Sequence, residues 1–141
     1  MAIVVSTYND FVTMRLRDGA IEALVGAGAR DDAIVVVPVP GAYEIPQAAR
    51  AAAASGRFDA IVCLGCVIRG ETPHFEYLAS AVAHGITAAA QVTGVPMTFG
   101  VLTTNSVEEA VERAGRGPAN KGWEAAMAAV QLAAVVRGFR A

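Results

Sequence analysis

A buried β-strand is predicted by residues 60–68, which read Ala-Ile-Val-Cys-Leu-Gly-Cys-Val-Ile and contain no charged side chain. Residues 33–39 form a second, valine-rich run, and near-continuous apolar runs are typical of strands covered on both faces. Two further strands are predicted over residues 3–6 and 95–102. These four runs are the expected hydrophobic centre of the molecule.

Helices are predicted between and after these strands. Apolar residues recur at helical spacing over residues 11–27, and Pro46 suits the first turn of a helix that ends near residue 55. Further helices are expected over residues 73–94 and 121–137, with a short one from the capping box at 106–109 to Gly115.

Strands that alternate with helices favour a parallel sheet with helices on both faces. The predicted fold is therefore α/β: a three-layer α/β/α sandwich around a four-stranded parallel sheet, of the flavodoxin-like class. A length of 141 residues without a linker or repeat indicates one domain over residues 1–141.

Composition and charge indicate which partners and which location to expect for this protein. The net charge is −2, so neither a nucleic-acid partner nor an anionic membrane surface is expected. No apolar run is long enough to span a bilayer, and the first residues do not resemble a signal peptide, so we expect a cytoplasmic protein. Charged residues make up only 17% of the chain, which suggests that other subunits cover part of its surface.

Metal and redox sites are disfavoured. Cys63 and Cys66 have CxxC spacing, but on a strand an offset of three turns the two side chains to opposite faces. His74 and His84 lie ten residues apart and lack a suitably spaced thiol or carboxylate companion. We therefore expect no metal and no disulfide.

Polar and aromatic side chains follow the carboxyl ends of the predicted strands. Tyr8 follows the first strand, Tyr43 and Glu44 follow the second, and Glu71 and His74 follow the third. Ligands of open parallel sheets bind at this edge. Two aromatic rings with polar groups beside them predict a slot for a flat heterocycle.

Lys121 is the single lysine among eleven basic residues and stands at the predicted start of the last helix. A flexible ammonium at a helix N-terminus is suited to binding an anion, although a solvated lysine explains the same pattern equally well.

Four segments carry a family resemblance: Gly-Ala-Tyr-Glu-Ile-Pro at 41–46, Leu-Gly-Cys-Val-Ile-Arg-Gly-Glu-Thr-Pro-His-Phe-Glu-Tyr at 64–77, Phe-Gly-Val-Leu-Thr-Thr at 99–104 and Asn-Lys-Gly at 120–122. In this order they resemble the lumazine synthases, which catalyse the penultimate step of riboflavin biosynthesis. The resemblance implies condensation of 5-amino-6-(D-ribitylamino)uracil with (S)-3,4-dihydroxy-2-butanone 4-phosphate, without cofactor or metal. Family members usually carry a longer N-terminal arm that adds a strand to a neighbour's sheet, whereas this sequence starts almost at its first strand.

The resemblance also implies a role for individual residues. Ribitylaminouracil would be bound by Tyr8, Ala42, Tyr43, Glu44, Cys66, Val67, Ile68 and Phe99, and butanone phosphate by Glu71, Thr72, Arg113 and Lys121. His74 would transfer protons, because an imidazole pKa near ~6.5 suits this at neutral pH. Glu71 would act through its backbone N–H, since its charge repels phosphate.

Each role has an ordinary structural alternative. Glu44 could be a helix-start carboxylate, Phe99 a core residue and Arg113 the (i, i+4) partner of Glu109. His74, at the predicted start of a helix, could have a capping or surface role, and we assign His84 to a surface role of this kind.

The assembly implied by the resemblance is a homo-oligomer built from pentamers, with active sites at subunit interfaces. Paired pentamers and a sixty-subunit icosahedral shell stay open, and riboflavin synthase is an implied partner. The alternative functions are a pentameric riboflavin synthase and a protein that stores a flavin or lumazine. Joint presence of His74, Arg113 and Lys121 argues against storage, which needs neither proton transfer nor a grip on phosphate.

Overall fold

A computed structural model describes residues 1–71 and 73–140. Its elements follow in the order β1 (Ala2–Ser6), α1 (Asp10–Gly26), β2 (Val35–Val39), α2 (Ile45–Ala54), β3 (Ile61–Ile68), α3 (Phe75–Thr93), β4 (Met97–Thr104), α4 (Val107–Arg113) and α5 (Lys121–Gly138). All neighbouring strands are parallel, in the order β2-β1-β3-β4. The predicted α/β architecture is confirmed.

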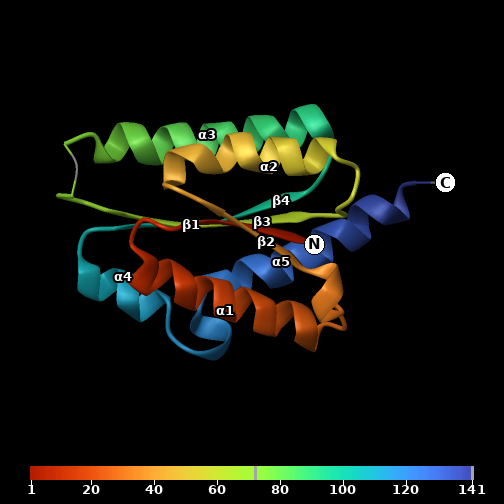
Figure 1. Ribbon diagram of the computed structural model, residues 1–141, viewed down its shortest axis with the longest axis horizontal. Helices are drawn as coiled ribbons and strands as arrows, with labels where there is room; N and C mark the ends of the chain where they lie inside the picture. Colours follow the sequence, from red (N-terminus) through yellow and green to blue (C-terminus); the bar gives the residue numbers. More distant parts are fainter. Residues whose placement is uncertain (72, 141) are drawn as a thin grey trace.

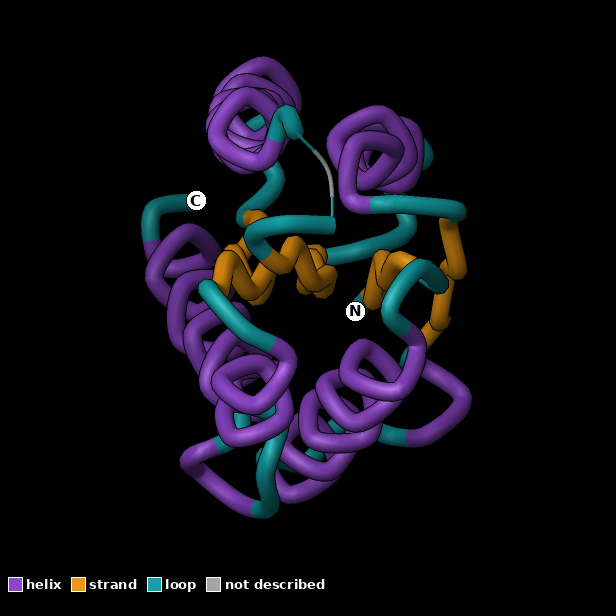
Figure 2. Tube along the Cα trace, turned by 90° about the vertical axis from the view of Figure 1, so that its left-hand side faces the viewer, coloured by secondary structure: helices purple, strands orange, loops and turns teal. Residues whose placement is uncertain are grey.

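Helices cover both faces of the sheet. Helices α2 and α3 lie on one face, and α1, α4 and α5 lie on the other (Figure 1). Figure 2 shows the same three layers from the side, with the strands between the two groups of helices. None of the helices within the described ranges is long and apolar enough to cross a membrane.

The central strand β3 behaves as its sequence predicts, because all eight of its residues are buried. Cys63 packs into the apolar cluster under α2 and α3, whereas Cys66 packs into the cluster under α1 and α5. Burial raises the pKa of both thiols to about 12, and the negative charge of Glu71 adds to the rise at Cys66. The predicted opposite orientation is confirmed.

The burial of strand β2 differs from its prediction. The valine run was expected to be covered on both faces, but β2 is an edge strand and its burial alternates. Val37 packs toward α2, whereas Val36 and Pro38 point to the other face and are exposed. Helix α1 packs over β1 and β3 instead, so it leaves this face of β2 uncovered.

The capping box before α4 differs slightly from its prediction. Ser106 Oγ accepts a hydrogen bond from the Glu109 N–H at 3.1 Å, as expected of an N-cap. The Glu109 carboxylate reaches back to the N–H of Asn105 at 3.2 Å, one residue before the cap. This bond ties the end of β4, which lies two residues later than predicted, to the start of α4.

Candidate active site

A cavity of about 220 Å³ lies where the loops after β1, β2 and β3 meet. It is lined by Tyr8, Gly41, Ala42, Tyr43, Cys66, Val67, Ile68, Glu71 and Leu78. Three chain segments converge there because the strands are parallel and their carboxyl ends share one edge. The fold thus brings together most of the residues expected to hold the heterocyclic substrate.

The loop after β1 is anchored to the end of β2. The Thr7 N–H donates to the Val39 carbonyl oxygen at 2.8 Å, and the Tyr8 N–H donates to that of Pro40 at 3.0 Å. These bonds hold the backbone of Tyr8 while its side chain stays 59% exposed at the cavity. An aromatic ring that is fixed at its base and open on its face is suited to stacking on a flat heterocycle.

The turn after β2 is stabilised by Glu44. Its Oε1 accepts a hydrogen bond from the Gly41 N–H at 2.9 Å, which closes the short 3₁₀ turn Ala42–Glu44. This is the helix-start role given above as the alternative for Glu44. The turn presents Ala42 and Tyr43 to the cavity, so Glu44 shapes the wall through its neighbours.

Asn9 connects two walls of the cavity and was missed by the sequence reasoning. Its Nδ2 donates to the Cys66 carbonyl oxygen at 3.1 Å and to Glu71 Oε1 at 2.9 Å. Its backbone is left-handed, with φ 63°, a conformation that asparagine adopts more readily than most residues. An asparagine directly before a helix is ordinarily read as an N-cap, whereas here the side chain reaches across to β3.

Glu71 lines the cavity, and its carboxylate accepts the hydrogen bond from Asn9. Its backbone N–H, expected to serve the phosphate, donates to the Ile68 carbonyl oxygen at 3.3 Å, so phosphate would have to share or replace this long bond. Thr72, expected beside it, lies outside the described residues.

The loop between β3 and α3 is braced by Arg69, a second residue that the sequence reasoning missed. Arg69 Nε donates to Asn105 Oδ1 at 3.0 Å, and its Nη1 donates to Glu76 Oε1 at 2.8 Å. Its guanidinium carbon lies 4.7 Å from the centre of the Phe75 ring. These contacts hold the first turn of α3, which directly follows His74.

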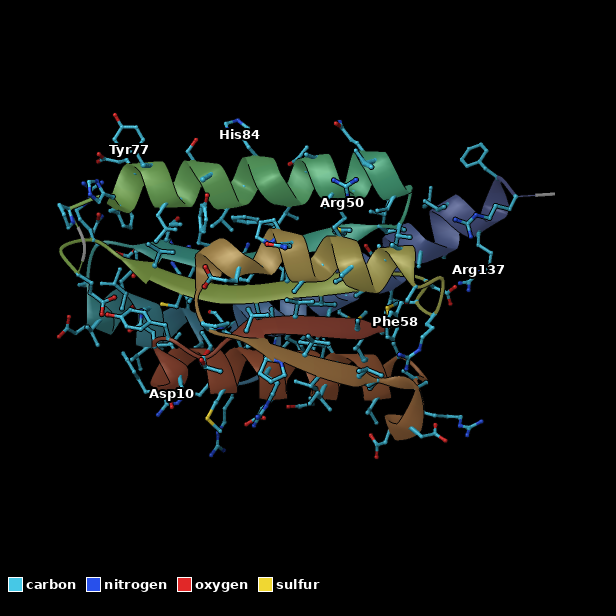
Figure 3. All side chains as sticks on the ribbon, turned by 45° about the horizontal axis from the view of Figure 1, so that its top comes forward. Asp10, Arg50, Phe58, Tyr77, His84 and Arg137 are labelled. Carbon is cyan, nitrogen blue, oxygen red and sulfur yellow. The ribbon has the colours of Figure 1, made fainter. Side chains whose placement is uncertain are left out.

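His74 is exposed at the N-cap of α3, one helical turn before Leu78, which lines the cavity. Its ring centre lies 6.5 Å from that of Tyr77. In Figure 3, His84 projects from the side of α3 that faces away from the sheet. Ser80 Oγ lies 3.3 Å from His84 Nδ1, which agrees with the surface role expected for His84.

Five of the expected site residues that the structure describes do not line the cavity of their own chain: Glu44, His74, Phe99, Arg113 and Lys121. Phe99 is on the edge strand β4 and is 40% exposed, so the alternative that it is a core residue is wrong. Arg113 Nη2 lies 3.7 Å from Glu109 Oε1, and Lys121 Nζ lies 3.3 Å from Glu124 Oε1. Within residues 1–71 and 73–140, no arginine or lysine lines the cavity.

No group of three or more histidine, cysteine or acidic side chains suited to a metal ion occurs in the part of the chain that the structure describes. The expectation that the reaction needs neither metal nor cofactor stays a prediction.

Known proteins resemble the whole chain. A family model described as 6,7-dimethyl-8-ribityllumazine synthase matches residues 1–137. A protein of Syntrophus aciditrophicus (strain SB) named 6,7-dimethyl-8-ribityllumazine synthase is 53% identical over 135 residues, which cover 96% of this chain and 88% of that protein.

Proposed function

The chain belongs to the 6,7-dimethyl-8-ribityllumazine synthase family, and from this premise we propose how its residues divide the work of the reaction. The enzyme is a transferase of riboflavin biosynthesis. It condenses 5-amino-6-(D-ribitylamino)uracil with (S)-3,4-dihydroxy-2-butanone 4-phosphate, and the products are 6,7-dimethyl-8-(1-D-ribityl)lumazine, phosphate and water.

The cavity at the carboxyl edge of the sheet receives ribitylaminouracil. The pyrimidine stacks on the exposed ring of Tyr8 and contacts the backbone of Val67 and Ile68 at the end of β3. The ribityl chain extends along the turn that Ala42 and Tyr43 form. Support comes from the convergence of these residues in one cavity whose walls are largely apolar but carry a carboxylate.

His74 moves protons at the mouth of this cavity. The amine of ribitylaminouracil attacks the ketone of butanone phosphate, and water leaves to form an imine. Phosphate is then eliminated, and the ribitylamino nitrogen attacks the carbonyl that this elimination creates and closes the ring with loss of a second water. Proton transfer by a positioned imidazole contributes about 10²–10⁴-fold to such steps. The remaining acceleration comes from holding both substrates in contact, which is why a rigid slot matters.

The phosphate is bound by Arg113 and Lys121 of a neighbouring subunit, and Phe99 of that subunit closes the pocket. These three residues do not line their own chain's cavity and are at least partly exposed, as a shared site requires. The ion pair between Arg113 and Glu109 is long and exposed, so it is weak enough to yield to a phosphate dianion. The assembly we propose is a homo-oligomer with five-fold symmetry.

The exposed surface of α3 agrees with burial between subunits. Tyr77 projects outward from this helix in Figure 3 and is among the most exposed apolar side chains of the described residues. Small residues such as Ala81 and Ala88 lie exposed on the same helix and permit close contact with a neighbour. A cytoplasmic location suits the two free cysteines, and riboflavin synthase is a suitable partner because it consumes the product.

The observation that carries this proposal is a cavity lined by most of the residues expected to hold the heterocycle, with no arginine or lysine of its own chain among the described residues that line it. A complementation experiment tests it. His74→Ala and Arg113→Ala subunits are unfolded together, refolded as a mixture and assayed for lumazine at a limiting concentration of butanone phosphate, where each variant alone should be at least about tenfold less active than wild type. Random mixing gives about one quarter of the sites two intact halves, so about one quarter of wild-type activity should return. Activity no higher than that of the separate variants would overturn the shared site.

A further inference from the structure

Two substrate subsites of the proposed function meet at one side-chain amide. Asn9 directly follows Tyr8, which belongs to the subsite for the heterocycle. Its Nδ2 donates to Glu71, one of the residues expected to serve butanone phosphate, and to the backbone of Cys66 near the end of β3. We propose, on the basis of that function, that Asn9 is a positioning residue that holds the Glu71 carboxylate away from the incoming phosphate.

The geometry explains why this position needs an asparagine. An amide nitrogen carries two hydrogens, and here one is directed to Cys66 O at 3.1 Å and the other to Glu71 Oε1 at 2.9 Å. The backbone of Asn9 is also left-handed, which glycine and aspartate accept but alanine does not accept without strain. Glycine keeps the backbone without the donor, and aspartate keeps the shape but replaces the donor by a negative charge.

The electrostatic consequence concerns the second substrate. Glu71 is exposed and lies in the loop that leads to His74, so a freely rotating carboxylate there would repel a phosphate dianion. The bond from Asn9 restrains it toward the start of α1. Arg69 lies two residues earlier, but it is engaged with Asn105 and Glu76, so it is not the group that restrains Glu71.

The first test is steady-state kinetics of Asn9→Gly with each substrate varied in turn. We expect the KM of butanone phosphate to rise about tenfold and that of ribitylaminouracil to change less than about threefold. The double variant Asn9→Gly/Glu71→Gln should have a KM for butanone phosphate close to that of Glu71→Gln alone. The loss caused by Asn9→Gly is then largely recovered, because no charge is left to restrain. A purely structural role of Asn9 predicts no such recovery.

The second test uses pH. In Asn9→Asp two carboxylates face each other, so one of them holds its proton to higher pH than usual and the hydrogen bond returns as the pH falls. Activity relative to wild type should therefore rise from pH 8 to pH 6. Cys66, with a pKa of about 12, stays neutral over this range. Asp10 and His74 are present in both proteins, so the ratio of the two activities reports the change at residue 9.

Asn105→Asp is the matched control for Asn9→Asp, because it adds the same charge at the same edge of the sheet but beside Arg69. Its activity should stay within about twofold of wild type. Unchanged KM values in Asn9→Gly, or no gain from the added Glu71→Gln, would overturn the inference while leaving the reaction intact. If Asn9→Gly does not fold, the inference is overturned by an activity of Asn9→Asp, relative to wild type, that does not change with pH. A wild-type protein that forms no lumazine would overturn the proposed function instead.

Discussion

Replacement of Asn120 by alanine should destabilise the enzyme more than replacement of any exposed residue of α5. Asn120 is 2% exposed and is the N-cap of that helix. Its Oδ1 accepts hydrogen bonds from the N–H groups of Gly122 at 2.8 Å and Trp123 at 3.1 Å. Its Nδ2 donates to the carbonyl oxygens of Gly115 at 2.7 Å and Arg15 at 3.1 Å. One side chain thus joins the start of α5, the preceding loop and helix α1.

The magnitude follows from these four contacts. Loss of the cap costs about 1 kcal/mol, and loss of each donor bond to a part-buried carbonyl costs about 1 kcal/mol more. The free energy of unfolding should therefore fall by about 3 kcal/mol, a large share of the ~5–15 kcal/mol that holds a domain folded. Gly19 leaves room for this side chain, because a Cβ there would lie 2.5 Å from Asn120 Oδ1. Gly19→Ala should displace Asn120 and cause a similar loss.

Urea unfolding followed by Trp123 fluorescence, at one subunit concentration for all variants, measures this change. Asn120→Ser keeps the acceptor of the cap but loses the two donor bonds, so its loss should be about 2 kcal/mol. Gln131→Ala, at an exposed position of α5, is the control and should stay within about 0.5 kcal/mol of wild type. A loss below about 1 kcal/mol in Asn120→Ala, or an equal loss in the serine variant, would refute the reasoning.

Three further predictions concern the site and the core. His74→Ala should lower kcat about tenfold or more with little change in substrate binding, whereas His84→Ala should have no effect; the reverse pattern in steady-state kinetics would reject the proton-transfer role. Arg113→Ala should raise the KM of butanone phosphate by a factor worth about 1.5–3 kcal/mol and leave that of ribitylaminouracil unchanged. Arg116→Ala is the control and should change little, and equal effects of Arg113→Ala on both KM values would indicate a distorted loop. The Cys63 pKa of about 12 exceeds the ~8.5 of an unfolded thiol, so its contribution to the free energy of unfolding is complete below about pH 8.5 and falls by about 1.4 kcal/mol per pH unit above it. Urea titrations from pH 8 to 10.5 should therefore show that this free energy declines less steeply with pH in Cys63→Ala than in wild type. Identical pH slopes would contradict the assignment.

Much of this protein was determined by local sequence pattern. Residues 60–68 form a buried strand because they are apolar without interruption, and this alone places Cys63 and Cys66 on opposite faces. The alternation of strands and helices then requires a parallel sheet, and a parallel sheet gathers Tyr8, Tyr43 and Glu71 at one edge. Periodicity, capping residues and chain order contain that information.

Only the tertiary structure decided the contacts between distant segments. Val36 is exposed because β2 is at the edge of the sheet, and its own valine run contains no sign of that. Asn9 and Glu71 are 62 residues apart, and their hydrogen bond exists only because β1 and β3 are adjacent in the sheet. The same applies to Arg69 and Asn105, which β3 and β4 bring together. Local pattern determines which segments form strands and helices. Which face of an edge strand is covered, and which partner each exposed polar group finds, depend on strand order and loop path, and these are settled by the packing of the whole chain.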